Sequence, residues 1–368
     1  MPASTGILPS HAISALIRER EIWAAGDIEA GQIQPASLDL RLGTTAYRLR
    51  ASFLPGPEAS VMDKVAAFAL HEIDLTGGAV LETGCVYLVP LLEALALAPR
   101  TSAVANPKSS TGRLDVFTRL ITDCGTEFDQ VAAGYQGPLF LEISPRTFPI
   151  LVRQGSRLAQ IRFRRGGPSH TDTELRALHE REHLVDTIAD IDQGLALSVD
   201  LAGEAKTGHH AGLIGFRAKR HSGLIDVDRR DAYNVLDFWD PVFVRGARRI
   251  ILDPDEFYIL ASREAVHVPA THAAEMMPYN PLVGEFRVHY AGFFDPGFGA
   301  KAAGGAGSRA VLEVRSHEVP FILEHGQIIG RLVYERLTAR PTQLYGEDIG
   351  STYQAQGLKL SKHFKAYS

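Results

Sequence analysis

Hydrophobic and polar residues along the chain recur mainly with the period of β-strands. In residues 38–42 the leucines alternate with Asp39 and Arg41, which is typical of a strand with one buried face. Residues 138–163 hold short apolar runs separated by Pro, Arg and Gly, and they predict the meander of a sandwich or barrel. The pattern therefore predicts a mainly β protein.

Helical patterns are few and short. Residues 10–21 form an amphipathic helical pattern that Ser10 is placed to cap. Residues 81–99 are rich in Leu and Ala, but Gly84, Pro90 and Pro99 interrupt them, so we expect two strands and a turn. Residues 166–182 begin with Gly and Pro and continue into a polar helix, which indicates a domain boundary.

The pattern of the first half returns in the second half at a constant spacing. Three residue pairs are each separated by 171 positions: Tyr87 and Tyr258, Glu93 and Glu264, Glu142 and Glu313. A duplication of one all-β unit is the simplest explanation. We therefore predict a first unit at residues 1–168, a helical linker at residues 169–205, and a second unit at residues 206–368 that carries a C-terminal tail.

Length and composition exclude several classes of protein and of functional site. At 368 residues the chain suggests two domains, and its net charge of -5 provides no basic field for a nucleic-acid polymer. The two cysteines, Cys85 and Cys124, form no CxxC pair, which excludes a disulfide framework or a Cys-rich zinc site and favours a reducing cytoplasm. No signal-peptide layout and no apolar run of about 20 residues occurs, so we expect no membrane association.

The candidate chemistry is concentrated in residues 106–142. This stretch opens with the cluster Lys108, Ser109, Ser110 and Arg113. Its fixed positive charges, its hydroxyl donors and the planar fork of arginine suit a polyphosphate. The stretch closes with Glu142 inside the apolar run LFLEI, where a carboxylate is costly unless it is paired, solvated or protonated. Periodicity alone leaves open whether Glu142 is an outward-facing strand residue or a functional carboxylate.

Four segments together resemble one family. The segments QIQPASLDLRLG and KSSTGR, a Gly-containing turn followed by LE, and a segment similar to RxGxxxxQIxF resemble the dCTP deaminases of the dUTPase-like superfamily. The resemblance implies two tandem dUTPase-like units, each a distorted jelly roll or β-barrel with a few short helices. It also implies dCTP as substrate, dTTP as an inhibitor, and a homo-oligomer, either a dimer or a trimer.

The resemblance also assigns roles to residues of the second half. The turn Asp295-Pro296-Gly297, the carboxylate Glu313, and a C-terminal segment that closes over the triphosphate all match the family. The site residues that it implies are Glu313 and Glu142 as catalytic carboxylates, and Lys108, Ser109, Ser110, Arg113, Asp295, Gly297, Tyr345, Tyr353, Gln356 and Lys359 as substrate-binding residues.

Each half departs from the family pattern. The first half has Ala132-Ala133-Gly134 in place of the Asp-Pro-Gly turn, the second half lacks the Lys-Ser-Ser cluster, and Thr352 replaces the family's Lys ahead of the second Tyr of the tail. These complementary losses suggest a composite site built from unlike halves.

The expected reaction is the hydrolytic deamination of dCTP to dUTP and ammonia, that of a hydrolase acting on C–N bonds in cyclic amidines. The H-x-E and P-C-x-x-C signature of zinc deaminases is absent, so we expect no zinc. A glutamate would act as general base and acid, and Mg²⁺ would come bound to the triphosphate. Two alternatives remain: a dUTPase or bifunctional enzyme in which Asp295 activates water, and an inactive regulator that only binds nucleotide.

Overall fold

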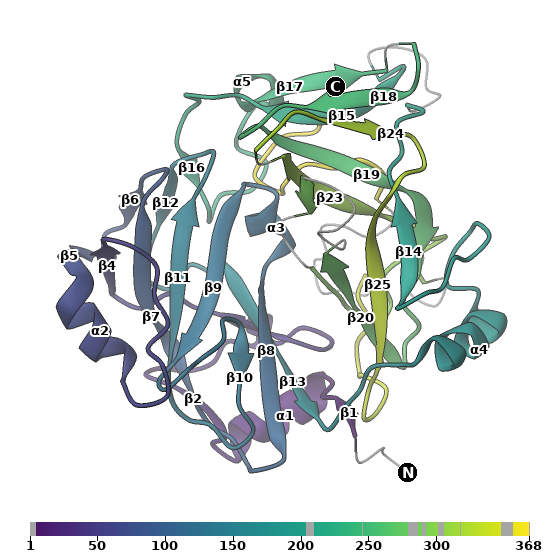
Figure 1. Ribbon diagram of the computed structural model, residues 1–368. Coiled ribbons are helices and arrows are strands. Elements are labelled where there is room, and N and C mark those ends of the chain that lie inside the picture. Colours follow the sequence, from purple (N-terminus) through teal and green to yellow (C-terminus); the bar gives the residue numbers. More distant parts are fainter. Residues whose placement is uncertain are drawn as a thin grey trace. The chain divides into compact units, whose positions relative to one another are not determined.

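The structure, a computed structural model, describes residues 5–203, 210–244, 246–278, 286–288, 292–300, 305–316, 318–346 and 356–367. The chain divides into two compact units. Unit 1 comprises Met1–Pro168, Gly223–Arg229 and Leu337–Gln343, and unit 2 comprises Ser169–Ser222, Arg230–Arg336 and Leu344–Ser368. Both are built mainly of strands, which confirms the predicted fold class (Figure 1).

Unit 1 contains three sheets. Its elements are β1 (Gly6–Ile7), α1 (Ser10–Arg18), β2 (Ile22–Ala24), η1 (Ala30–Gln32), β3 (Leu38–Leu40), β4 (Thr45–Leu49), α2 (Val61–Phe68), β5 (Ala69–Asp74), β6 (Ala79–Leu81), β7 (Val86–Ala96), β8 (Thr101–Pro107), α3 (Ser109–Gly112), β9 (Val116–Thr122), β10 (Gln130–Val131), β11 (Gln136–Pro145), β12 (Ile150–Val152), β13 (Ala159–Arg165) and β16 (Ile225–Asp226). One sheet has the order β1-β13-β8-β10 with β3 beside β13, the second has the order β5-β4-β7-β11-β9 with β2 beside β7, and the third has the order β16-β12-β6.

Unit 2 repeats this plan. Its elements are α4 (Asp172–Glu182), β14 (Leu195–Ser198), β15 (Leu213–Ala218), α5 (Val235–Phe238), β17 (Trp239–Phe243), β18 (Arg249–Leu252), β19 (Phe257–Val266), β20 (His272–Pro278), β21 (Phe286–Val288), β22 (Phe293–Phe294), β23 (Ser308–Ser316), β24 (Phe321–Glu324) and β25 (Ile328–Arg336). Its sheets have the orders β14-β25-β20-β22, β17-β15-β19-β23-β21 and β18-β24. These orders match those of unit 1 except that β1, β2 and β16 have no counterpart among the described strands of unit 2, so the duplication inferred from sequence is visible in the topology.

The register of the two central strand pairs is also the same. Glu142 of β11 lies opposite Leu88 of β7, and Glu313 of β23 lies opposite Ile259 of β19, at positions that differ by the sequence offset of 171. A second duplicated detail is the tyrosine at the start of each long strand. The hydroxyl of Tyr87 accepts a hydrogen bond from the N–H of Glu82, as that of Tyr258 does from Asp253.

The strands that precede this core correspond at a different offset. In unit 1, Leu42 donates its N–H to the carbonyl of Ser156 and its own carbonyl accepts from Gly155; in unit 2, Val199 makes the same two bonds with Gln327 and Gly326. This match aligns β3 with β14 at an offset of 157 residues, so Asp39 corresponds to Ala196.

Three local predictions were wrong. Residues 138–163 do not form a meander, because β11, β12 and β13 belong to three different sheets. Pro90 lies inside β7 and does not end it; the register with β11 shifts there, between Pro138 and Phe140. Ser10 is the first residue of α1 and makes no capping bond, since Pro9 occupies the cap position.

Each unit has an apolar core. In unit 2 the buried side chains of β14, β19, β20, β23 and β25 form one cluster with leucines of α4. In unit 1 a smaller cluster lies under α2, and Leu88, Ile121 and Phe140 contribute to it from β7, β9 and β11. Glu142 belongs to the same strand as Phe140, two residues further on, so its side chain faces the same side of the sheet.

Candidate functional site

The Lys-Ser-Ser cluster lies where β8 ends and α3 begins. Lys108 precedes α3, and its carbonyl accepts hydrogen bonds from Thr111 (2.8 Å) and Gly112 (3.0 Å). The side chains of Ser110 and Arg113 are buried, at 5% and 3% exposure. The structure therefore brings the predicted phosphate-binding residues of the first half together on one short turn of unit 1.

Lys108 has an acidic neighbour that the motif did not reveal. Its Nζ forms an ion pair with the buried carboxylate of Asp39 on β3. Asp39 faces Gln160 across the sheet, and Gln160 faces Asn106, so three polar side chains form a row over β3, β13 and β8. The Oδ1 atom of Asp39 is buried and has no hydrogen-bond partner among the described residues.

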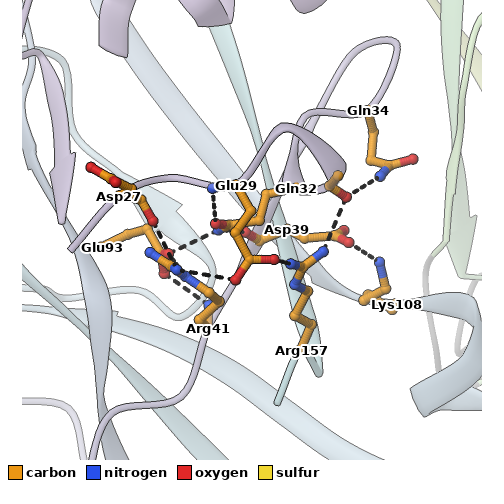
Figure 2. A network of polar contacts seen from close by, with 10 residues as sticks. Asp27, Glu29, Gln32, Gln34, Asp39, Arg41, Glu93, Lys108 and Arg157 are labelled. Carbon is orange, nitrogen blue, oxygen red and sulfur yellow. Dashed lines mark hydrogen bonds and ion pairs between the residues drawn. The ribbon is translucent and has the colours of Figure 1, made fainter. Parts of the chain in front are cut away.

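A network of polar side chains supports the strand that carries Asp39 (Figure 2). Gln32 donates from Nε2 to the carbonyl of Asp39 (2.9 Å) and to Oε1 of Glu93 (2.9 Å). Glu93 is buried and also accepts from the backbone N–H and from Nε of Arg41, at 2.8 Å and 2.7 Å. These bonds satisfy the buried Glu93 and fix the position of Asp39.

Glu142 is buried and paired with an arginine. Its side chain is 1% exposed, and Arg119 of β9 lies directly opposite it in the sheet. The Nε and Nη2 atoms of Arg119 both donate to Oε1 of Glu142, at 3.0 Å and 2.6 Å. Oε2 is buried without a hydrogen-bond partner among the described residues. The interpretation of Glu142 as an outward-facing strand residue was wrong.

Glu313 lies at the corresponding position of unit 2. It is 6% exposed and sits in the middle of β23. The beginning of that strand holds part of the C-terminal segment. Gln356 donates from Nε2 to the carbonyl of Arg309 (3.1 Å), and the N–H of Arg309 donates to the carbonyl of Gln356 (3.1 Å). Glu313 therefore lies on β23, the strand to which Gln356 of the C-terminal segment is hydrogen-bonded.

The Asp-Pro-Gly turn of unit 2 contacts the start of the C-terminal segment. Tyr345 donates its N–H to the carbonyl of Pro296 (2.8 Å), and its ring lies 5.8 Å from that of Phe298. Gly297 has φ +96°, and a Cβ there would lie 2.8 Å from Cβ of Leu344 and 3.0 Å from the N atom of Tyr345. Only glycine fits this turn while the segment stays in place.

The predicted site residues thus fall into two groups. Lys108, Ser109, Ser110, Arg113 and Glu142 lie in unit 1, whereas Asp295, Gly297, Glu313, Tyr345, Gln356 and the exposed Lys359 lie in unit 2. Tyr353 lies outside the described residues.

The sequence motifs did not identify Arg119 or the network around Glu93. The repeated Glu93/Glu264 pair was the available signal for the network, because Glu264 likewise accepts from the N–H and Oγ of Ser198.

The described residues contain neither a cluster of metal-ligating side chains nor a membrane-spanning helix. No three or more His, Cys, Asp or Glu side chains there are grouped so that they could share a metal ion. No helix in that part of the chain has the length and hydropathy needed to cross a membrane.

The fold and site define a tandem β-protein with a buried carboxylate repeated at one register. Family models account for nearly the whole chain. The 2'-deoxycytidine 5'-triphosphate deaminase (DCD) N-terminal domain matches residues 4–167, and the corresponding C-terminal domain matches residues 171–364. The chain therefore belongs to the dCTP deaminase family, as the sequence motifs predicted.

A solved structure is similar over almost all of the chain. The crystal structure of 2'-deoxycytidine 5'-triphosphate deaminase from Agrobacterium tumefaciens shares 63% identity and a TM-score of 0.87, and the match covers 91% of this chain and 99% of that one.

Curated relatives match a shorter part. The dCTP deaminase of Haloarcula marismortui is 29% identical over 134 residues, which are 36% of this chain and 66% of the relative. The dUMP-forming dCTP deaminase of Halobacterium salinarum is 32% identical over 117 residues, 31% of this chain and 55% of the relative. The chain thus spans less than two thirds of the length of these relatives.

Proposed function

We propose that this protein is a dCTP deaminase that hydrolyses dCTP to dUTP and ammonia without zinc. The observation that carries the proposal is a buried carboxylate, Glu313, at a duplicated register in a chain whose two halves match the two dCTP deaminase domains. The similarity to the Agrobacterium tumefaciens enzyme supports the same substrate.

The carboxylate of Glu313 supplies the proton transfers. It accepts a proton from water as the water oxygen bonds to C4 of cytosine, and passes this proton to N3 of the ring. It then takes the proton of the new C4 hydroxyl and delivers it to N4 as the C4–N4 bond breaks, so that ammonia leaves and the ring carries a C4 carbonyl and an N3–H. Such general acid–base catalysis accounts for about 10²–10⁴-fold in rate. Donors near the developing charge on the pyrimidine ring would add electrostatic stabilisation.

The basic cluster of unit 1 binds the triphosphate in this proposal. Arg113 and Lys108 supply fixed positive charge, and Ser109 and Ser110 supply hydroxyl donors. In binding phosphate, Lys108 exchanges part of its interaction with Asp39 for the substrate. Mg²⁺ arrives coordinated by the phosphates and neutralises their charge.

The C-terminal segment closes the site. Tyr345 contacts the Asp295–Gly297 turn, and Gln356 contacts β23, so the segment is anchored at two points to elements that carry site residues. Tyr353 and Lys359 would complete the closure on the phosphates. We place the protein in the cytoplasm, as its two separate cysteines suggest, with dTTP as a candidate inhibitor.

A second candidate activity is further hydrolysis of dUTP to dUMP. The relative from Halobacterium salinarum is a dUMP-forming dCTP deaminase, and Asp295 provides a carboxylate in the turn where water would be activated toward the α-phosphate. A nucleotide-binding regulator without turnover is the remaining alternative.

One product analysis separates these functions. The full chain is incubated with dCTP and Mg²⁺, and separately with dUTP and Mg²⁺, and the nucleotides are resolved by chromatography while ammonia is assayed. dUTP with an equal amount of ammonia supports the deaminase. Conversion of dCTP to dUMP, pyrophosphate and ammonia supports the bifunctional enzyme, conversion of dUTP alone to dUMP and pyrophosphate supports a dUTPase, and the absence of any product supports the regulator.

A further inference from the structure

Glu142 of unit 1 has a charged partner that the sequence motifs do not reveal, and this partner lies on β9. Glu142 has Arg119 as its cross-strand neighbour, and both donors of the guanidinium that face it bind one oxygen, Oε1. This is a charge-assisted pair in which the carboxylate is 1% and the arginine 24% exposed. Charge-assisted hydrogen bonds are about twice as strong as neutral ones.

Arg119 is itself held in place from three directions. Its guanidinium carbon lies 3.7 Å from the ring centroid of Phe128 and 4.8 Å from that of Phe117. Its Nη2 also donates to Oγ of Ser52 at 2.6 Å. Cation–π contacts are strengthened when the cation is removed from water. The arginine therefore cannot move away from Glu142 without losing several interactions at once.

The surroundings of the pair are apolar. Leu88 lies opposite Glu142 on β7, and it packs in the cluster with Ile121 and Phe140, against which Phe128 also packs. In such an environment a lone charge is far more costly than a matched pair. A carboxylate that shuttles a proton must give up its charge in every turnover. For Glu142 this would leave the Arg119 cation without its partner.

The turn near this carboxylate also lacks the family's polar group. Unit 1 has Ala132-Ala133-Gly134 where unit 2 has Asp295-Pro296-Gly297. A Cβ on Gly134 would lie 3.3 Å from Cα of Pro99, whereas a Cβ on Gly297 would meet Leu344 and Tyr345, so the turn of unit 2 contacts the C-terminal segment.

We infer that Arg119 makes Glu142 a structural ion-pair partner, and that Glu313, not Glu142, is the catalytic carboxylate of the duplicated pair. This assignment rests on the proposed deaminase function, and it places the proton transfers at Glu313, one of two equivalent positions in the duplicated units. After the duplication, Glu142 thus stabilises unit 1 and takes no part in catalysis.

Kinetics provide the first test. Glu142→Gln removes the proton acceptor but keeps an oxygen that accepts from Arg119, so the variant loses stability while that hydrogen bond remains, and its kinetics are measured well below its Tm. We expect kcat and KM for dCTP within about twofold of the wild type, whereas Glu313→Gln loses roughly 10²-fold or more in kcat. A loss of that size in Glu142→Gln, with nucleotide binding retained, overturns the inference.

A double-mutant cycle provides the second test, which does not depend on activity. Arg119→Met leaves a buried carboxylate unpaired and should lower the Tm by roughly 10 °C, while the matched surface change Arg146→Met should shift it by about 1 °C or less. The pair Arg119→Met with Glu142→Leu should regain most of that loss, because no buried charge remains. Additive losses without recovery overturn the structural role.

The two tests also separate this inference from the proposed function. A wild-type protein that releases no ammonia from dCTP overturns the deaminase and, with it, the assignment of Glu313. The ion-pair role of Arg119 is then decided by the unfolding cycle alone, since Tm recovery in the double variant supports it whether or not dCTP is turned over.

Discussion

At the scale of single residues, the neighbour across the sheet decides what a charged side chain can do, as Arg119 does for Glu142. Lys108, Arg113 and Glu313 stand in motifs with fixed spacing, so sequence alone identifies them as candidates. Asp39 and Arg119 act through cross-strand neighbours, and such pairing depends on register, which periodicity does not determine. The partner that decides what a residue can do is therefore visible only in the folded chain.

Glu313 should carry the proton transfers. We expect Glu313→Gln to lower kcat for deamination by roughly 10²-fold or more, because the amide keeps the size of the side chain but cannot accept the proton. Binding of dCTP, measured by calorimetry with the same variant, should stay within a few-fold of the wild type. Normal turnover in this variant would remove Glu313 from the mechanism.

A histidine pair in unit 2 should make its stability depend on pH. Nε2 of His170 lies 2.8 Å from Nε2 of His272, and Nδ1 of His272 lies 2.9 Å from Oγ1 of Thr271. Burial lowers the pKa of His272 to about 4, and His170, Arg181 and Arg336 add repulsion. Burial is also the main cause that lowers the pKa of His170, while Glu174 acts in the opposite direction.

The direction of this pH effect follows from the lowered pKa values. The pKa of both histidines is lower in the folded chain than in the unfolded chain, which takes up protons near pH 6.5, so stability is full above that pH and falls as the pH decreases toward about 4, the pKa of His272. We expect the Tm to fall by about 5 °C or more between pH 7 and pH 4.5. His272→Gln should have a shallower pH profile in the same calorimetric scan, and an identical slope would contradict this assignment.

At the scale of elements, duplication was the strongest signal in the sequence. The offset of 171 residues correctly paired β7 with β19 and β11 with β23, because glutamates and tyrosines mark the same register in both halves. The correspondence of β3 with β14 was hidden, since its offset is 157 residues and Asp39 has become Ala196. Boundaries of short strands, and the distribution of residues 138–163 over three sheets, depend on long-range pairing that local patterns do not contain.

The turn and the C-terminal segment should work as one element. We expect truncation before Tyr345 to raise KM for dCTP by roughly tenfold or more, because a closing segment supplies binding to both the ground and the transition state. Gly297→Ala should reproduce part of this increase, since the added methyl displaces Leu344 and Tyr345. Gly84→Ala, at another positive φ but with open space around it, is the matched control. Unchanged steady-state kinetics in the truncated protein would indicate that the segment has no role.

At the scale of the whole molecule, two short segments of the second half belong to unit 1. Gly223–Arg229 contributes β16, which pairs in parallel with β12, and Arg153 binds Asp226 through two bonds of 2.8 Å. The composition does not change at these two segments, so the sequence could not indicate that they belong to unit 1.

Assembly follows from what each unit retains. Unit 1 keeps Lys108, Ser109, Ser110 and Arg113, whereas unit 2 keeps Asp295, Gly297, Glu313 and the closing segment. In the family that the motifs resemble, one site takes residues from neighbouring β-units, and three units close a ring. Because a chain offers two units, we propose that chains associate, as a dimer or as a trimer with six units.

Complementation between inactive variants should reveal how the site is shared. Arg113→Ala removes the phosphate fork of unit 1 and Glu313→Gln removes the base of unit 2, so each variant alone should be inactive. If a site joins unit 1 of one chain to unit 2 of another, mixing them under conditions that exchange chains creates some assemblies with an intact Arg113 facing an intact Glu313. We then expect ammonia release from dCTP to return to roughly a quarter of the wild-type rate, as random pairing of chains in a dimer requires. The double variant mixed with either single variant is the control and should stay inactive. If mixing restores nothing although mass spectrometry shows that chains have exchanged, the site forms within one chain and the idea of sharing between chains is wrong.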